Sequence, residues 1–182
     1  MSDQPDAKAL VEFSRPFQLA EFSNAPEHHV ELAASETERE ALAARNSVLS
    51  LDKLEAQLTV RRVAVGDIVV EGKLNAELVQ ECVVTLEPVG DTVSAPFDQR
   101  YTQNPPALAA DLEVGPDDIE PPEPIIGDSI DLGELVAQFL SLSINPYPRA
   151  AEEDAQAEQI LPKPPEDGPF SVLAQLRDRD QD

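Results

Sequence analysis

The chain carries the stretch Ile130-Asp-Leu-Gly-Glu-Leu-Val-Ala-Gln-Phe-Leu-Ser-Leu-Ser-Ile-Asn-Pro-Tyr-Pro-Arg149, which predicts one helix with a defined beginning and end. Asp131 can cap the first turn, and Glu134, three residues later, can complete a capping box. Pro146 ends the helix because it disfavours the α conformation at the residue before it, and Pro148 follows at once. The apolar residues fall near helical spacing and form one stripe, made of Leu132, Leu135, Val136, Phe139, Leu140 and Ile144.

This stripe leaves two interpretations of the helix open. We expect about three to four helical turns that bury the stripe against a core. The segment is then either an ordinary core helix with a proline stop, or a core helix whose Pro-Tyr-Pro-Arg exit binds a partner. Tyr147 and Arg149 are the candidate binding residues of that exit, because an aromatic ring and a positive charge lie on a stiff backbone in an acidic stretch.

Upstream of this helix, three runs alternate apolar and polar residues, which is the pattern of half-buried strands. The runs cover residues 48–63, 68–86 and 92–103, and turn residues separate them. A twist or bulge is expected around Gly72 in the second run. Three long consecutive strands predict an antiparallel meander that can curl into a barrel-like sheet.

The residues before the meander predict two shorter strands and a helix. Residues 11–22 alternate in part, and Pro16 places this strand at an edge or a bulge. A second short strand covers residues 29–33. Ser35 and Glu38 then form a capping box that opens a helix over residues 36–45.

The predicted fold class is α+β, with an antiparallel, strongly curved, barrel-like β-sheet core, a few packed helices and acidic proline-rich flexible segments. Five segments are expected: a flexible tail (1–10), one core domain (11–149), an acidic proline-rich linker or lid within it (104–127), a disordered acidic segment (150–168), and a short helix with a tail (169–182). The last helix has Phe170 and Leu173 on one face. It either docks on its own domain or forms a portable binding motif.

The net charge of the chain is the feature that most directly indicates what kind of partner it can bind. The 182 residues carry 36 acidic and 13 basic side chains, for a formal net charge of −23. Nucleic-acid binding depends on Lys and Arg that neutralise phosphates, so this charge opposes direct binding of naked RNA. A basic partner is favoured instead, although acidity that only maintains solubility is the alternative. The N-terminus lacks a basic and apolar leader, and no apolar run is long enough for a membrane span, so we expect a cytoplasmic protein with no membrane contact.

Catalytic and metal-binding patterns are not visible in the sequence. There is no phosphate-binding glycine loop and no nucleophile elbow, and His28 and His29, being adjacent, would face opposite sides of a strand. Cys82 is the only cysteine, so it can form no internal disulfide, and it is expected to be a small core residue. We therefore expect no enzyme activity, no metal and no cofactor.

Four motifs together resemble the YceD family. They are Cys82-Val-Val-Thr-Leu-Glu-Pro-Val89, Ile130-Asp-Leu-Gly-Glu-Leu-Val136, Asn145-Pro-Tyr-Pro-Arg149 and a Pro-Phe-x-x-Leu-x-x-Leu pattern from Pro169 to Leu176. The resemblance is to the form found in α-proteobacteria. It implies a small cytoplasmic protein with a β-rich core, needed for accumulation of large-subunit (23S) ribosomal RNA, and it supplies no catalytic residues.

One departure from the family pattern concerns Cys82. Many relatives have Cys-x-x-Cys-Leu-x-Pro here, whereas this chain has Thr85 at the second cysteine position, so a metal or redox role of a cysteine pair cannot operate. The residues left in common are expected to be architectural, with Leu86, Glu87 and Pro88 forming a turn that Pro88 fixes. Asp131, Glu134, Pro146 and Pro148 are expected to be structural in the same way.

Three functions compete at this point. The preferred one is a non-enzymatic ribosome-biogenesis factor that acts through a basic ribosomal protein or an assembly factor. The second is a protein-interaction module that regulates lipid or envelope synthesis and docks through the Pro-Tyr-Pro-Arg exit and the last helix. A hydrolase or nuclease that acts on ribosomal RNA ranks last, because the sequence shows no recognisable cluster of metal ligands and no candidate general base.

Overall fold

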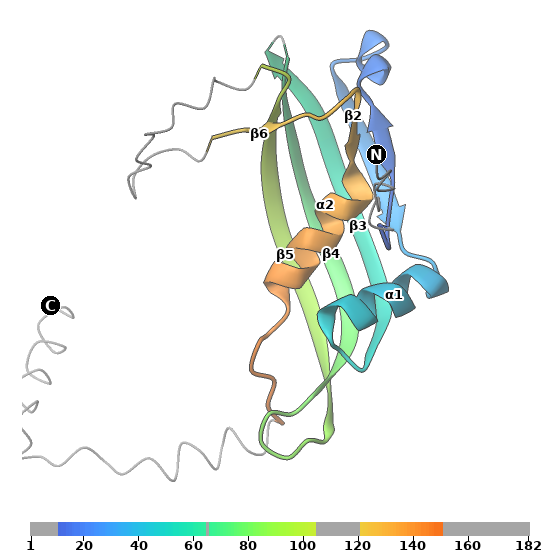
Figure 1. Ribbon diagram of the computed structural model, residues 1–182, viewed down its shortest axis with the longest axis vertical. Coiled ribbons are helices and arrows are strands. Elements are labelled where there is room, and N and C mark those ends of the chain that lie inside the picture. The colour runs from blue at the N-terminus through green and yellow to red at the C-terminus, as the bar shows by residue number, and fades with distance from the viewer. Residues whose placement is uncertain (1–10, 65, 105–120, 151–182) are drawn as a thin grey trace, which may run out of the picture. The chain divides into compact units, whose positions relative to one another are not determined.

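The structure is a computed structural model that describes residues 11–64, 66–104 and 121–150. The chain divides into two units, Met1–Pro148 and Arg149–Asp182, and Arg149 and Ala150 are the described residues of the second. The predicted tail (1–10), most of the acidic linker, nearly all of the predicted disordered segment (150–168) and the last helix with its tail lie outside the described residues. The described part has an α+β fold, as predicted, with two helices, a five-stranded sheet and a two-stranded sheet (Figure 1).

The elements follow one another along the chain in a simple order. They are β1 (Pro16–Gln18), a 3₁₀ helix (Leu19–Ser23), β2 (Glu27–Ala33), α1 (Glu36–Asn46), β3 (Ser50–Ala64), β4 (Asp67–Glu81), β5 (Pro88–Thr102), β6 (Glu123–Pro124), β7 (Ser129–Asp131) and α2 (Leu132–Ser143). The large sheet has the order β2-β3-β4-β5-β6, and β1 pairs with β7. The strand predicted over residues 11–22 is wrong in extent: only Pro16–Gln18 is strand, because Leu19 and Phe22 are buried at the three-residue spacing of a 3₁₀ turn.

The predicted antiparallel meander is confirmed by β3, β4 and β5, each 15 residues long. Alternate residues of these strands are buried on one face of the sheet and exposed on the other, as the sequence alternation requires. The predicted bulge at Gly72 is wrong, since the register shifts of β3 and β4 lie near Leu51 and near Arg62. Gly72 has a different role: a Cβ atom there would lie 2.9 Å from Gln57 O and 3.0 Å from the Phe97 ring.

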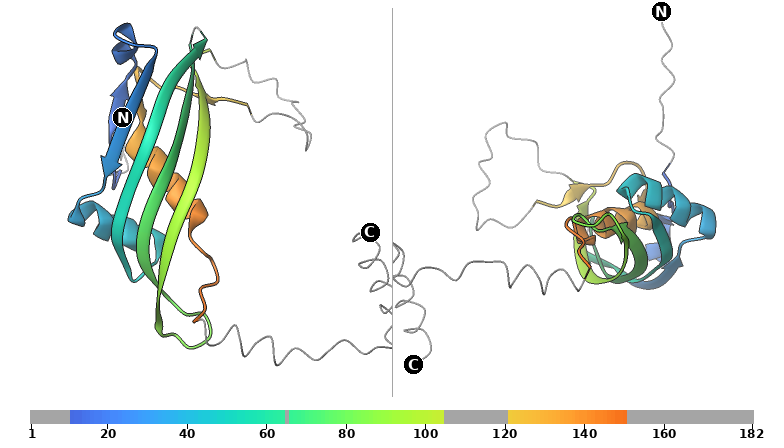
Figure 2. Two further views of the ribbon diagram at one scale, coloured as in Figure 1. Left: turned by 180° about the vertical axis from the view of Figure 1, so that it is seen from behind. Right: turned by 90° about the horizontal axis from the view of Figure 1, so that it is seen from below.

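The sheet stays open, so the predicted strongly curved, barrel-like sheet is not supported. β6 is two residues long and pairs in parallel with Tyr101 and Thr102 of β5, and in the described residues β2 and β6 do not meet. One face of the sheet is covered instead by α1, which packs on β3, and by α2, which packs on β4 and β5, and no described helix covers the opposite face (Figure 2). The two helices therefore complete the core, and the sheet has no need to close on itself.

Both helices begin where the sequence predicts. In α1, Ser35 and Glu38 form the predicted capping box. In α2, the apolar stripe is buried, with Leu132, Val136 and Leu140 at most 1% exposed. Phe139 is only partly buried, and its ring stacks on Phe97 with the centroids 4.6 Å apart. No helix of the described residues has the length and apolar character to cross a membrane.

The free edge of β5 is chemically protected against strand addition. Thr102 O accepts from Ile125 N at 2.8 Å, so the backbone groups of Thr102 point towards β6 and away from β4. The register between β4 and β5 is unbroken, so the other even-numbered residues of β5 also point their backbone groups away from β4. Pro96 is one of these residues and has no N–H to offer. The N–H of Thr92 is already taken, because it donates to Asp91 Oδ1 at 2.7 Å. Proline and charge at such positions are known devices against edge-to-edge pairing.

The segment before β1 joins α1 to α2 through one arginine. Arg15 Nη1 and Nη2 donate to the two carboxylate oxygens of Glu38 at 2.7 and 3.0 Å, and the guanidinium also lies 4.7 Å from the Phe13 ring centroid. The hydrogen bond from Arg15, helped by hydrogen bonds from Ser35, lowers the pKa of Glu38 to about 2. A bidentate pair of this kind is stronger than a single hydrogen bond between neutral groups.

Glu38 should make stability pH-dependent in one direction. Because its pKa is lower in the folded than in the unfolded state, its contribution to the free energy of unfolding is present above about pH 5 and is lost as the pH falls toward about 2. We expect Glu38→Gln to be less stable than the wild type at neutral pH and nearly equal to it close to pH 2. Urea unfolding of both proteins across that range measures the difference, and a difference that does not depend on pH would contradict the assignment.

Candidate functional site

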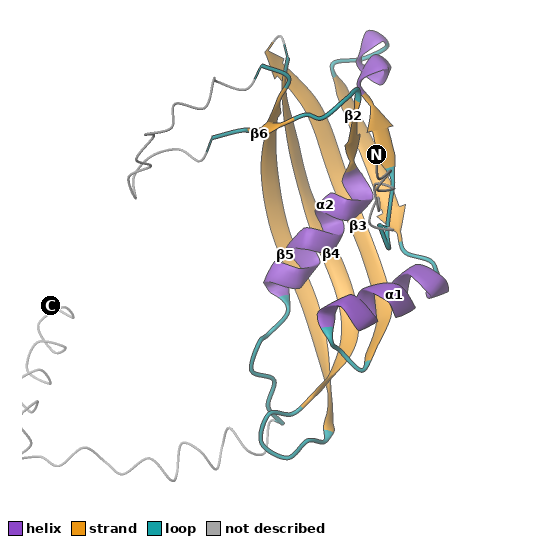
Figure 3. Ribbon diagram, viewed as in Figure 1, coloured by secondary structure: helices purple, strands orange, loops and turns teal. Residues whose placement is uncertain are grey.

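Two of the family-like motifs meet at one end of the sheet, beyond the last residues of β4. Gln80 Nε2 donates to Asn145 O at 2.9 Å, and Val83 N donates to Pro148 O at 3.0 Å. These bonds join the connection between β4 and β5 to the exit of α2 (Figure 3). We call residues 82–88 and 145–148 the loop end.

The loop itself is closed by its own backbone. Cys82 N donates to Glu87 O at 2.9 Å, and Leu86 N donates to Cys82 O at 3.0 Å. Glu87 N donates to Thr85 Oγ1 at 3.4 Å. Thr85, which occupies the position of the second cysteine in many relatives, therefore contributes a hydrogen bond to the turn. Pro88 is already the first residue of β5, so the predicted turn is wrong in extent: it ends before Pro88, and the strand begins earlier than the predicted residue 92.

Leu86 adopts the left-handed conformation, with φ of 63°. This conformation costs a residue with a Cβ atom roughly 1–2 kcal/mol, and glycine is its usual occupant. The Leu86 side chain is nevertheless 67% exposed and therefore gains little from burial. An exposed apolar residue at a strained position is an outlier of the kind that accompanies function.

Replacing Leu86 with Gly should stabilise the protein or leave its stability unchanged. The left-handed strain is removed, but the unfolded chain gains entropy, so we expect the free energy of unfolding to rise by about 0–1 kcal/mol. Thermal and urea unfolding measure this. A loss of more than about 1 kcal/mol would show that the Leu86 side chain stabilises the fold, and would remove the argument for another role.

The loop end exposes several large apolar side chains. Val83, Val84, Leu86 and Tyr147 are 45%, 59%, 67% and 72% exposed, whereas Cys82 is fully buried, as predicted. Glu81 and Glu87 lie beside them in the sequence and are exposed. The structure therefore combines an apolar surface with neighbouring negative charge at one end of the sheet.

The other predicted site residues lie elsewhere. Asp131 and Glu134 are at the beginning of α2, Pro146 and Pro148 are in the loop end, and Phe170 and Leu173 lie outside the described residues. Arg149 belongs to the second unit, and its side chain is exposed. The sequence did not single out Val83, Val84 or Gln80; the side-chain amide oxygen of Gln80 is buried and has no hydrogen-bond partner among the described residues.

The predicted capping box of α2 is half correct. Asp131 Oδ1 accepts from Gly133 N and Glu134 N at 3.0 and 3.1 Å, as an N-cap does. Glu134 does not reach back to the cap. Its carboxylate instead pairs with both Nη atoms of Arg45 at 3.0 Å, because a bidentate charge-assisted pair is stronger than one bond to a backbone N–H.

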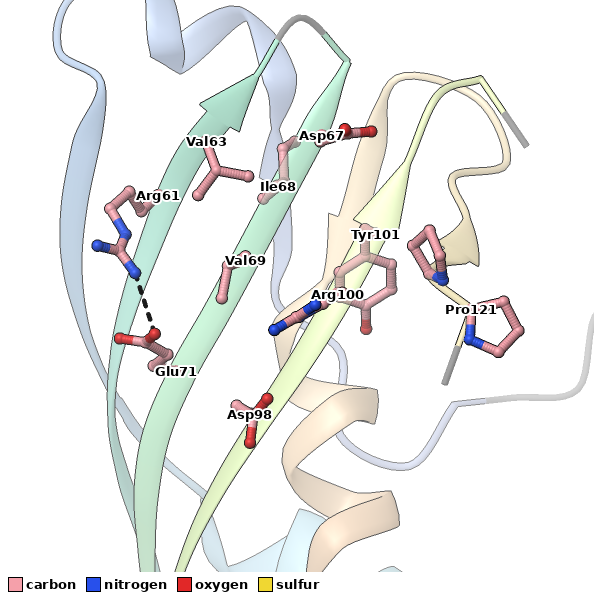
Figure 4. Close-up of a pocket in the computed structure, with 11 residues that line it drawn as sticks. Arg61, Val63, Asp67, Ile68, Val69, Glu71, Asp98, Arg100, Tyr101 and Pro121 are labelled. Atoms are coloured by element: carbon pink, nitrogen blue, oxygen red, sulfur yellow. Dashed lines mark hydrogen bonds and ion pairs between the residues drawn. The ribbon is translucent and has the colours of Figure 1, made fainter. Parts of the chain in front are cut away.

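A hollow of about 500 Å³ lies on the helix-free face of the sheet, at the end opposite the loop end. Arg61 and Arg100 flank Val69 across three strands there (Figure 4). Its lining also includes Asp67, Glu71 and Asp98, and Arg61 already pairs with Glu71 at 3.0 Å. Acidic groups outnumber basic ones, so this hollow does not favour a phosphate ligand.

Within the described ranges, no group of three or more His, Cys, Asp or Glu side chains could hold a metal ion. The two histidines have ordinary neighbours. The His28 ring lies edge-on to Phe17 and Phe22, and its Nε2 is 3.1 Å from Ala25 O. His29 Nδ1 is 3.0 Å from Thr59 Oγ1 on the exposed face.

These observations first define a class of protein: a small α+β protein in which two helices cover one face of an open, mixed sheet and a closed loop presents apolar side chains. This chain belongs to the YceD family, because the family model described as "Large ribosomal RNA subunit accumulation protein YceD" matches residues 70–177, more than half of its length. Neither a curated protein nor a solved structure matches the chain. The α-proteobacterial form stays a prediction.

The family match includes both parts of the loop end and the whole of α2. The family name implies a role in the accumulation of large-subunit ribosomal RNA, and it describes an accumulation factor, not an enzyme.

Proposed function

We propose that the chain is a non-enzymatic, cytoplasmic factor for accumulation of the large-subunit (23S) ribosomal RNA, and that it acts by binding a basic ribosomal protein or assembly factor. Family membership supports the biological role. The net charge of −23 supports the mode of action, and it is the single observation that carries the proposal.

Electrostatics favour a protein partner over naked RNA. Residues 74–99 and 101–148 contain no Lys or Arg, although they include β6, β7, α2 and most of β4 and β5. Several basic side chains elsewhere are already paired with glutamates, namely Arg15, Arg45, Lys53 and Arg61. Phosphates would meet repulsion over most of this surface, whereas a Lys- and Arg-rich protein would be attracted.

The proposed mechanism is charge shielding. A basic ribosomal protein that binds this acidic surface is kept from non-specific contacts until ribosomal RNA, with its denser negative charge, displaces it. The complex should therefore weaken as salt screens the charges and as RNA competes.

A capture experiment tests the proposal. The full chain is immobilised and incubated with proteins extracted from purified large ribosomal subunits, at low and at high salt, with and without purified 23S RNA. We expect salt-sensitive capture of one or a few basic proteins and their release by the RNA. Capture of 23S RNA in the absence of any basic protein would overturn the proposal, as would no capture at all.

The exit of α2 supplies a variant for the same experiment. We expect Tyr147→Ala combined with Arg149→Ala to leave the melting temperature nearly unchanged and to weaken capture, because both side chains are exposed. The matched control is Leu142→Ala combined with Arg100→Ala, an exposed apolar side chain and an exposed arginine outside the loop end. A large loss of melting temperature in the first variant would assign both residues to architecture, and equal capture by the two variants would deny them a binding role.

A further inference from the structure

We infer that the loop end binds a short partner segment in which apolar side chains are flanked by Lys or Arg. The inference deepens the proposed function and rests on it for one point only, that the partner is a basic protein. It adds the surface of this chain that makes the contact and the chemistry of the segment that fits it.

The apolar half of the argument comes from exposure. Val84, Leu86 and Tyr147 are each more than half exposed, as are Leu49, Val63, Ile126 and Leu142 outside the loop end. Exposed apolar residues that are scattered singly have no special meaning, but the three in the loop end belong to two chain segments held together by hydrogen bonds. Water would be released from all of them if a partner covered this one end.

The loop end is also ordered before a partner arrives. The backbone of Cys82 accepts and donates hydrogen bonds across the turn, Val83 N is bonded to Pro148 O, and Tyr147 N donates to Asn145 Oδ1 at 3.0 Å. Prolines on both sides of Tyr147 restrict its backbone further. A surface that is already ordered loses little entropy on binding, which favours a specific contact over a loose one.

The basic half of the argument comes from charge. The exposed Glu81 and Glu87 bracket the loop, and no Lys or Arg occurs in residues 74–99 or in residues 101–148. Arg149 follows Pro148 directly, so the acidic charge is concentrated at the β4–β5 side of the loop end. If the bound segment had only apolar side chains, the carboxylates of Glu81 and Glu87 would have no counter-charge. Lys or Arg residues on either side of an apolar centre would complement them.

Charge argues against two other occupants of the same surface. A second copy of the chain would place the same carboxylates opposite one another across a two-fold axis, which repels. An anionic membrane surface would repel them as well. Both remain outcomes that the test below distinguishes.

Two synthetic peptides of equal charge test the inference with the full chain. One has a central Leu-Val-Leu flanked on each side by lysines, and the other has Ser-Thr-Ser between the same lysines. We expect fluorescence anisotropy to show that the first peptide binds the wild type about tenfold more tightly than the second, or better still. Equal binding of the two peptides, or no binding of the first, overturns the inference.

Paired variants locate the contact. Val84→Ser with Leu86→Asn removes apolar surface from the loop end, and Asn tolerates the left-handed conformation of residue 86. Leu49→Ser with Val63→Ser is the matched control, since these residues are 54% and 53% exposed outside the loop end. We expect the first variant alone to lose the preference for the Leu-Val-Leu peptide; retention of the preference overturns the inference.

The same proteins separate this inference from the proposed function. If the loop-end variant captures large-subunit proteins as the wild type does, the docking surface is refuted and the proposed function stands. If the peptide preference is confirmed but no large-subunit protein is captured, the proposed function fails and the docking chemistry stands. Sedimentation that shows a wild-type dimer broken by the loop-end variant, or flotation of the wild type with anionic vesicles, would assign the surface to another occupant and overturn the inference.

Discussion

Replacing Gly133 with Ala should lower the free energy of unfolding by about 2 kcal/mol, although Ala is the better helix former by about 1 kcal/mol. Gly133 lies in the first turn of α2, where the backbone of the N-terminal segment crosses it. A Cβ atom would lie 2.6 Å from Phe13 O and 2.9 Å from Arg15 N. Both are backbone atoms, so one of the two segments must move, and the bond from Leu132 N to Arg15 O at 3.0 Å would be disturbed.

A second glycine provides the control. Gly90 in β5 has no heavy atom within 4 Å of a Cβ position, and its φ is negative, so Gly90→Ala should leave stability unchanged or raise it slightly. Urea unfolding of both variants measures the contrast. If Gly133→Ala were as stable as Gly90→Ala, the close crossing of the two segments would not exist in solution.

Replacing Asp131 with Ala should cost about 3 kcal/mol, more than an ordinary N-cap. One carboxylate oxygen accepts from Gly133 N and Glu134 N, and also from Arg15 N at 2.8 Å. The other accepts from Ser14 Oγ at 2.5 Å. The same side chain therefore begins α2 and holds the N-terminal segment across it.

Two comparisons separate these roles. Ser35→Ala removes the N-cap of α1, which makes no such long-range bond, and should cost about 1 kcal/mol. Asp131→Asn keeps an acceptor oxygen and should cost less than Asp131→Ala. Chemical unfolding provides the values. A loss for Asp131→Ala no larger than that for Ser35→Ala would mean that the link to the N-terminal segment contributes nothing.

Local signals explain which parts of the fold could be predicted. The limits of α2 follow from Asp131 before it and Pro146 after it, and the three long strands follow from alternation, because these features act over a few residues. Gly133 was also a signal in the sequence. A glycine within a predicted helix lowers helix propensity, which indicates that another part of the chain packs closely against that position.

Long-range contacts explain what could not be predicted. Glu134 pairs with Arg45, 89 residues away, and so abandons the capping box that its local sequence predicts. Both helices pack on one face of the open sheet, and no local sequence pattern predicts which surface a helix will pack against. The loop end depends in the same way on the bond from Gln80 to Asn145, which lie 65 residues apart. Val83 and Val84 are exposed in the connection after β4, whereas the sequence alone predicted both to lie in a strand.

The protected edge of β5 limits which contacts another chain can make with the sheet there. Strand addition reads mostly backbone groups and accepts many sequences, including those of incompletely folded chains. With no N–H at Pro96 and the N–H of Thr92 already taken, strand addition at this edge is unfavourable. Recognition of another chain along this edge would then depend on side chains, which discriminate among sequences. The same features disfavour the growth of an intermolecular sheet from this edge.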